Sequence, residues 1–136
     1  MESDRTPENE PPAPIRIMIA DDDDFVGAAL VELIRATPGL SFAGFAFDAP
    51  SAIELADREQ PDIAIVDVRM PGGGGVSATI GIRATSPRTR VIAFSGDHEE
   101  LTEQAMRSAG AVDFVLKGTS IELIVDRLVA ASASAV

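Results

Sequence analysis

Acidic side chains gather at two points in the sequence where apolar segments end. Four consecutive aspartates, Asp21 to Asp24, follow the apolar run 15–20, and Asp67 follows the apolar run 62–66. Neighbouring like charges repel one another, so four in a row beside a buried segment point to a function that needs them. Because the chain has no cysteine and one histidine, this pattern favours a site for a hard cation: Mg²⁺, with Ca²⁺ or Mn²⁺ as lesser candidates.

A Mg²⁺ site of this kind indicates phosphoryl chemistry. The ion typically takes one or two carboxylates and keeps its waters for a phosphate-bearing substrate. Ser95, after the apolar run 90–94, offers a hydroxyl group. Lys117, the only lysine in the chain, follows the run 113–116 and offers a compact positive charge for phosphoryl oxygens.

Five short apolar segments, rich in β-branched or aromatic residues, are predicted to be the strands that position these groups. Helical periodicity fills the gaps between them, most clearly at 25–34 and 121–129, where apolar residues recur at a spacing of 3.6. The predicted strands are Ile15–Ala20, Leu40–Phe45, Asp62–Val66, Arg90–Phe94 and Asp113–Leu116.

This alternation predicts an α/β fold, a (βα)5 doubly wound five-stranded parallel sheet with helices on both faces. Such a flavodoxin-like sheet commonly has strand order 2-1-3-4-5, and it binds ligands at the carboxyl ends of strands 1 and 3. We therefore expect the four aspartates and Asp67 to meet at that edge.

Capping residues mark the expected helix starts. Two of them have a glutamate three residues later, which is the spacing of a capping box. The glycines at 72–75 predict a flexible turn before the third helix rather than a phosphate-binding loop, because no Lys-Ser or Lys-Thr follows them. The predicted caps are Asp24, Asp48, Asp97 and Thr119.

Four aromatic or titratable positions outside the acidic groups have simpler interpretations. His98 is expected to be an exposed residue in a first helical turn. The trio Phe42, Phe45 and Phe47 is expected to pack around the second strand rather than to bind a ligand.

Length and composition limit the classes of protein to consider. A chain of 136 residues with 46% hydrophobic content suits one folded domain. A net charge of −11 gives no reason to expect nucleic-acid binding by this domain itself. With no long apolar run and no cysteine, we expect a cytoplasmic protein without membrane contact. We divide the chain into a disordered acidic, proline-rich tail (1–14), one domain (15–130) and a C-terminal tail or linker start (131–136).

Four motifs, in order along the chain, resemble those of the receiver domain of two-component response regulators, the aspartate-phosphorylated family of bacterial signalling. "IADDDDF" resembles the acidic pair after the family's first strand. "VDVRMPGGGG" resembles its phospho-acceptor strand and Met-Pro turn, with Gly75 at its usual glycine. "FSG" and "VLKG" resemble its hydroxyl and lysine segments, although the family often has proline where Gly118 stands. The resemblance runs from Ile15 to about Val129.

The resemblance implies a role for each acidic residue. Asp67 would be the nucleophile that takes a phosphoryl group from a phosphohistidine on a sensor histidine kinase or a histidine phosphotransfer protein. Asp67, Asp22 and the backbone carbonyl of Arg69 would ligate a Mg²⁺ cofactor directly, and Asp21 would do so through water. Lys117 would hold a phosphoryl oxygen.

The resemblance also implies a switch. Ser95 would move to hydrogen-bond the phosphoryl group, and the ring of Phe114, at the family's aromatic switch position, would turn inward. The face formed by the fourth helix, fifth strand and fifth helix would then change its partners. Arg69 and Asp97 lie where the family tunes the lifetime of the phosphoaspartate, and we expect them to pair across the site mouth.

We therefore interpret the chain as a domain that catalyses its own phosphorylation and slow dephosphorylation. Two other interpretations compete with this one. One is a non-phosphorylated pseudo-receiver that serves only for docking. The other is a hydrolase with an aspartyl-phosphate intermediate, although Arg69 stands where such enzymes usually have a second acid. The sequence identifies neither the kinase nor an output domain or protein target, and it leaves homodimerisation open.

Overall fold

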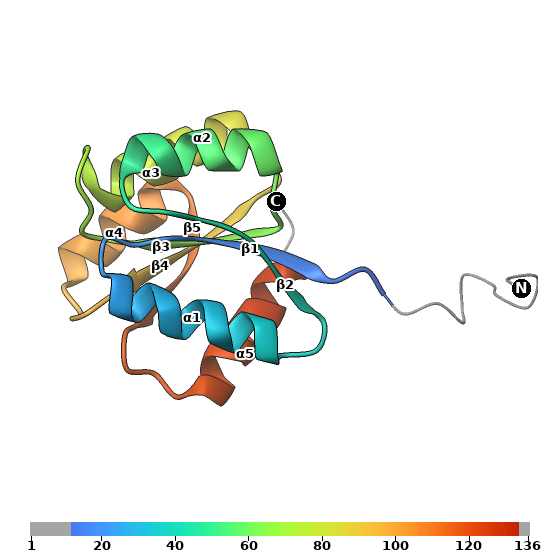
Figure 1. Cartoon of the computed structure of the whole chain (residues 1–136). Coiled ribbons are helices and arrows are strands. Elements are labelled where there is room, and N and C mark those ends of the chain that lie inside the picture. Colours follow the sequence, from blue (N-terminus) through green and yellow to red (C-terminus); the bar gives the residue numbers. More distant parts are fainter. Residues whose placement is uncertain (1–11, 134–136) are drawn as a thin grey trace, which may run out of the picture.

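The structure is a computed structural model that describes residues 12–133. Within this range, five strands alternate with five helices (Figure 1). Each helix connects two strands of one sheet except the last, which follows β5. The elements are β1 (Ile15–Ala20), α1 (Asp24–Ala36), β2 (Leu40–Ala46), α2 (Ala49–Glu59), β3 (Ile63–Asp67), α3 (Gly74–Thr85), β4 (Arg90–Ser95), α4 (Glu100–Ala109), β5 (Ala111–Leu116) and α5 (Ile121–Ser132).

The sheet is parallel throughout and its strand order is β2-β1-β3-β4-β5. The prediction of a (βα)5 flavodoxin-like fold is therefore confirmed. At the carboxyl edge, Ala20 pairs with Val66 and Asp67 pairs with Phe94. The strands that precede the predicted site residues thus end at the same edge of the sheet.

Helices α2, α3 and α4 cover one face of the sheet and α1 and α5 cover the other (Figure 1). An apolar layer of the core lies on each face. Successive residues of a strand point to opposite faces. In β1, Met18 packs toward α2, α3 and α4, whereas Ile17 and Ile19 pack toward α1 and α5. The central strands are therefore apolar on both faces except near their ends, as a sheet covered on both faces requires.

The helix starts differ from the predictions by one or a few residues. Asp48 caps α2 as predicted, accepting from the Ser51 N–H at 2.8 Å. At α1 the cap is Asp23 rather than Asp24, and its Oδ1 accepts from the Phe25 and Val26 amides. Aspartates at either position suit the positive end of a helix, so the sequence pattern did not separate them.

The two predicted capping boxes are wrong. Ser120 caps α5, because the hydroxyl of Thr119 donates to the Leu116 carbonyl within the preceding turn. Glu99 occupies the N-cap position of α4 without a side-chain cap, and Asp97 lies two residues earlier.

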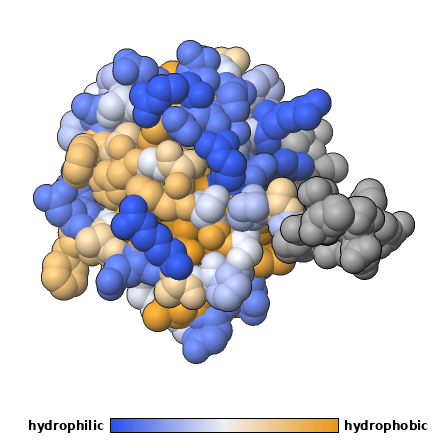
Figure 2. Space-filling view, turned by 45° about the vertical axis from the view of Figure 1, so that its right-hand side comes forward, coloured by the Kyte–Doolittle hydropathy of each residue, from blue (hydrophilic) through white to orange (hydrophobic). Residues whose placement is uncertain are grey.

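Several apolar residues predicted to face the core are exposed. Leu30 and Ile34 of α1 are buried, but Phe25 at its start is 86% exposed. Phe47 lies just beyond β2 and is also exposed, but its ring packs against that of Phe45 on β2 with centroids 4.8 Å apart, so the predicted packing around the strand is present at the surface. Figure 2 shows separate hydrophobic patches bordered by hydrophilic side chains on one face of the molecule.

Within the described residues, regular secondary structure begins at Ile15 and ends at Ser132. Helix α5 continues to Ser132, two residues past the predicted domain end, because Ala131 is buried against the core. Residues 12–14 have no regular secondary structure, and the rest of the predicted tails, 1–11 and 134–136, lie outside the described residues. Between residues 12 and 133, the helices are too short or too polar to cross a bilayer.

Candidate functional site

Four chemically active residues lie at the carboxyl ends of the strands. Asp67 and Ser95 are the last residues of β3 and β4, and Asp21 and Lys117 directly follow β1 and β5. The backbone hydrogen bonds continue past the strand ends: the Lys117 N–H donates to the Ser95 carbonyl at 2.7 Å. The sheet itself therefore fixes where these side chains start.

Three carboxylates form an acidic cluster, Asp21, Asp22 and Asp67. One oxygen from each lies within 4.8 Å of the other two. Asp21 is 1% exposed and Asp67 is 5% exposed, whereas Asp22 is open to solvent. Two buried like charges at this distance are unfavourable unless a positive charge compensates them.

Lys117 supplies part of that compensation. Its Nζ lies 3.2 Å from Asp21 Oδ2 and 3.4 Å from Asp67 Oδ2. Burial acts to lower the pKa of Lys117, but the charges of Asp67 and Asp21 outweigh this effect and raise it. The lysine is therefore a fixed cation on one side of the cluster.

The carboxyl group of Asp67 is less acidic than an ordinary aspartate. Burial is the main cause, and with the negative charge of Asp21 it raises the pKa of Asp67 from 3.8 to about 6, against the opposing effects of the Arg69 N–H and Lys117. The Arg69 N–H donates to Asp67 Oδ1 at 3.2 Å. The Lys117 ammonium and the Arg69 amide therefore stabilise the ionised carboxylate of Asp67 by less than burial and Asp21 destabilise it.

The cluster fits a divalent cation. Its donors are all carboxylate oxygens, the ligands preferred by Mg²⁺. Asp21 Oδ1 accepts from the Asp23 N–H at 2.8 Å, but the buried Asp21 Oδ2 has only the ion pair with Lys117 Nζ at 3.2 Å and no well-formed hydrogen bond among the described residues. A buried oxygen in that position is suited to a cation or to one of its water ligands.

The cluster opens into a polar cleft of about 270 Å³. At its mouth, Arg69 Nη2 lies 3.5 Å from Asp97 Oδ2 and 3.7 Å from Glu99 Oε1. The predicted contact between Arg69 and Asp97 is present, and Glu99 is an additional partner. The cleft is lined by Asp22, Asp23, Asp67, Arg69, Ser95, Gly96, Asp97 and Lys117.

The predicted switch residues lie on two neighbouring strands, Ser95 on β4 and Phe114 on β5. Ser95 Oγ donates to the Asp97 carbonyl at 2.6 Å, within its own loop. Phe114 on β5 is 8% exposed and packs into the core layer beneath α4. His98 precedes α4 rather than lying in its first turn, and its ring packs edge-on against Phe114.

Helix α3 begins directly against the backbone of the site. The Gly75 N–H donates to the Val68 carbonyl at 2.9 Å. A Cβ atom at position 75 would lie 2.6 Å from the Asp67 carbonyl oxygen, so only glycine allows this approach. Gly72 and Gly73 adopt positive φ in the turn before α3, as predicted, whereas Gly74 and Gly75, also predicted to lie in the turn, already belong to the helix.

The family model for the response regulator receiver domain matches residues 17–129, most of the chain. The chain belongs to this family. The receiver domain is 38% identical over 106 residues to a protein-glutamate methylesterase/protein-glutamine glutaminase of Thermotoga maritima, covering 76% of this chain and 30% of the relative. It is 36% identical over 110 residues to the transcriptional regulatory protein PdtaR of Mycobacterium tuberculosis, covering 79% and 52%.

Solved structures agree with this assignment. The signal receiver domain of NarL from Mycobacterium tuberculosis superposes with a TM-score of 0.86 at 27% identity, covering 91% of this chain and all of that one. The receiver domain described here spans about a third to about half of the curated relatives named above.

The sequence analysis predicted most, but not all, of the residues that meet in the cleft. Asp21, Asp22, Asp67, Ser95 and Lys117 converge at one edge of the sheet. Asp23 was predicted only as a helix-start residue, and the contact of Glu99 with Arg69 was missed. The only available signal for Glu99 was its spacing of two from Asp97, which places both on one side of an extended loop.

Proposed function

We propose that this receiver domain accepts a phosphoryl group on Asp67 from the phosphohistidine of a sensor histidine kinase or of a histidine phosphotransfer protein. The observation that carries the proposal is the convergence of three carboxylates and Lys117 at one edge of the sheet, where the polar cleft opens. A buried carboxylate beside a cation and next to an acidic cluster is suited to nucleophilic attack on phosphorus.

In the proposed reaction, a carboxylate oxygen of Asp67 forms a bond to phosphorus and the P–N bond to the donor histidine breaks. The bonding electron pair passes to the imidazole nitrogen, and the product is an acyl phosphate on Asp67. Lys117, between Asp21 and Asp67, holds a phosphoryl oxygen. Asp22, Asp67 and the Arg69 carbonyl would hold a Mg²⁺ ion directly, and Asp21 would do so through water; the bound ion would supply positive charge to offset that of the transferring group.

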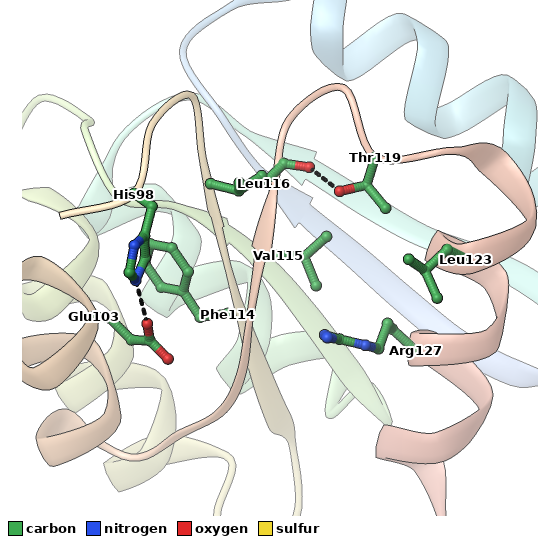
Figure 3. Close-up of a pocket in the computed structure, with 8 residues that line it drawn as sticks. All are labelled: His98, Glu103, Phe114, Val115, Leu116, Thr119, Leu123 and Arg127. Carbon is green, nitrogen blue, oxygen red and sulfur yellow. Dashed lines mark hydrogen bonds and ion pairs between the residues drawn. The ribbon is translucent and has the colours of Figure 1, made fainter. Parts of the chain in front are cut away.

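The proposal includes a change at the α4–β5–α5 face. The Ser95 hydroxyl leaves the Asp97 carbonyl to donate to the phosphoryl group, and the ring of Phe114 turns inward as Ser95 moves. A cavity of about 240 Å³ lies between α4, β5 and α5, beside Phe114 and Leu123 (Figure 3). Its polar and apolar lining suits a protein target whose affinity depends on the position of these residues.

Arg69 and Asp97 are proposed to prolong the phosphoaspartate by narrowing the cleft mouth to water. Replacing either with alanine should then speed dephosphorylation. In a double-mutant cycle, the joint effect should be smaller than the sum of the single effects, since both changes break one contact. Additive effects on the rate would contradict this role.

The first test is the intact mass of the protein after incubation with acetyl phosphate and Mg²⁺. We expect one added phosphoryl group, which is absent with Asp67→Asn and after chelation of the metal. Asp22→Asn and Asp24→Asn remove the same charge from neighbouring positions, but only Asp22 belongs to the acidic cluster. Asp22→Asn should abolish the adduct and Asp24→Asn should leave it.

Two competing functions predict other results. A pseudo-receiver used only for docking gives no adduct and does not bind beryllofluoride. A hydrolase with an aspartyl-phosphate intermediate turns over a phosphate ester continuously. We further propose that the domain works in the cytoplasm, and that it controls an output domain, a separate protein target or its own dimerisation.

A further inference from the structure

The loop between β4 and α4, residues 96–99, directs its side chains to two different sides. Asp97 and Glu99 face Arg69 at the mouth of the cleft. His98, between them, faces the cavity of Figure 3. Its Nε2 lies 2.7 Å from Glu103 Oε1 on α4, and its ring meets the edge of the Phe114 ring with centroids 5.8 Å apart.

Glu103 gives His98 a well-held partner. The Arg107 Nε–H donates to Glu103 Oε2 at 2.8 Å, one turn along α4. Hydrogen bonds from Arg107 and then from His98 hold the pKa of Glu103 below its ordinary value, so this carboxylate is ionised at neutral pH. His98 therefore connects the loop to α4 by a charge-assisted hydrogen bond and to β5 by a ring contact.

The same loop holds Ser95 in place. Ser95 Oγ makes two contacts with Asp97, the residue before His98. It donates to the Asp97 carbonyl at 2.6 Å, and it lies 3.3 Å from the Asp97 backbone nitrogen. Ser95 cannot turn toward Asp67 without breaking these bonds. A rearrangement of the Asp97 backbone changes the position from which the next side chain, His98, reaches Glu103 and Phe114.

We propose that His98 is a positioning residue that couples the Ser95 loop to Phe114 and helix α4. The inference rests on the proposed phosphorylation of Asp67, and it assigns a regulatory contact to a residue outside the four sequence motifs.

The other charged groups around this cavity are engaged elsewhere. Arg127 of α5 lines the cavity, but its Nη1 lies 2.9 and 2.8 Å from the two oxygens of Asp113 on β5. Arg107 also lies 3.9 Å from Asp113. Glu103 and the Phe114 ring are therefore the groups through which His98 acts. The open side of the cavity gives the imidazole room to move with its loop.

The contacts of His98 occur in the arrangement in which Ser95 Oγ is bonded to its own loop. They stabilise this arrangement relative to one in which Ser95 reaches the phosphoryl group. Their removal should favour the second arrangement, so His98→Ala should bind beryllofluoride, an analogue of the phosphoryl group, about threefold more tightly or better in the presence of Mg²⁺.

The single histidine of the chain makes the coupling directly observable. In a one-dimensional proton NMR spectrum, the His98 ring protons should shift when beryllofluoride is added to the Mg²⁺-loaded protein. The Phe114 ring beside them is the source of most of this shift, so Phe114→Leu should greatly reduce it. Mg²⁺ alone is the control addition.

Paired variants separate the two contacts. His98→Gln keeps a hydrogen-bonding group for Glu103 without the ring, and His98→Phe keeps a ring without the hydrogen bond. Glu103→Gln removes the charged partner, and Glu100→Gln removes one charge from the same helix outside the cavity. Calorimetric titration with beryllofluoride should give tighter binding for His98→Phe and Glu103→Gln, a smaller change for His98→Gln and none for Glu100→Gln.

The outcomes distinguish this inference from the proposed function. If wild type forms no adduct with acetyl phosphate and does not bind beryllofluoride, both fail. If beryllofluoride binds but the His98 signal stays in place, or if His98→Ala and Glu103→Gln bind it like wild type, phosphorylation at Asp67 stands and the coupling through His98 is overturned.

Discussion

The two ends of the sheet treat buried polar groups in opposite ways. At the amino-terminal end, Thr89 and Ser86 are fully buried and their hydroxyl oxygens lie 2.6 Å apart. Thr89 Oγ1 also donates to the Pro61 carbonyl at 2.7 Å. These neutral groups satisfy one another and connect two loops, so their burial is compatible with a stable fold.

At the carboxyl-terminal end, the buried groups are charged and incompletely compensated. Asp21 and Asp67 share one lysine, and Asp21 Oδ2 has no well-formed hydrogen bond within the described chain. Functional sites commonly reduce stability in this way, because groups arranged for a ligand are not arranged for one another. The contrast predicts that removing a buried carboxylate at the carboxyl-terminal end stabilises the fold, whereas removing a buried hydroxyl at the amino-terminal end destabilises it.

The largest effect should come from Lys117→Met, which removes the cation and keeps most of the apolar stem. Two buried carboxylates then lose their only charged partner within the described residues, so we expect the free energy of unfolding to fall by about 3 kcal/mol at pH 7.5 in a chelator. Urea denaturation measures this change in the free energy of unfolding. Arg58→Met, at an exposed ion pair, is the control and should change stability by under about 1 kcal/mol.

Asp67→Asn should have the opposite sign. A carboxyl group whose pKa is raised to about 6 on folding destabilises the native state once it is ionised. The variant should therefore be more stable than wild type by about 2 kcal/mol at pH 7.5 without metal, and this gain should disappear as pH falls from about 6 to about 4. Urea titrations across this range test it, with Asp113→Asn, which loses its ion pair with Arg127, as a destabilising control. A gain that persisted at pH 4 would contradict the assignment to Asp67.

The smallest of the three effects is expected at the amino-terminal end. Thr89→Val keeps the shape of the side chain but leaves the Pro61 carbonyl and the Ser86 hydroxyl without this partner, which should cost about 1 to 2 kcal/mol. The yield of the Asp67 adduct with acetyl phosphate should equal that of wild type below the unfolding transition. A reduced yield in a folded variant would show that the two ends are not independent.

The features that could be predicted from the sequence depend on periodicity and topology. Alternating strands and helices determined the sheet order, and the sheet order brought Asp21, Asp67 and Lys117 together. Features that depend on one side-chain rotamer or one hydrogen bond were not predictable. The choice of Asp23 over Asp24 as cap is of this kind, because both satisfy the same sequence rule. The contact of His98 with Phe114 joins residues 16 positions apart, and no sequence pattern predicts that their rings meet.

The close approach of Gly75 to the Asp67 carbonyl has a consequence for protein engineering. The start of α3 rests on the end of β3 with no side chain between them, so a residue larger than glycine at position 75 would change how deeply Asp67 lies below the cleft. Transplanting the acidic cluster and the lysine onto another α/β sheet would reproduce the ligands but not this depth. A designed phospho-acceptor of this type therefore needs the glycine and the helix that follows it, in addition to the charged residues.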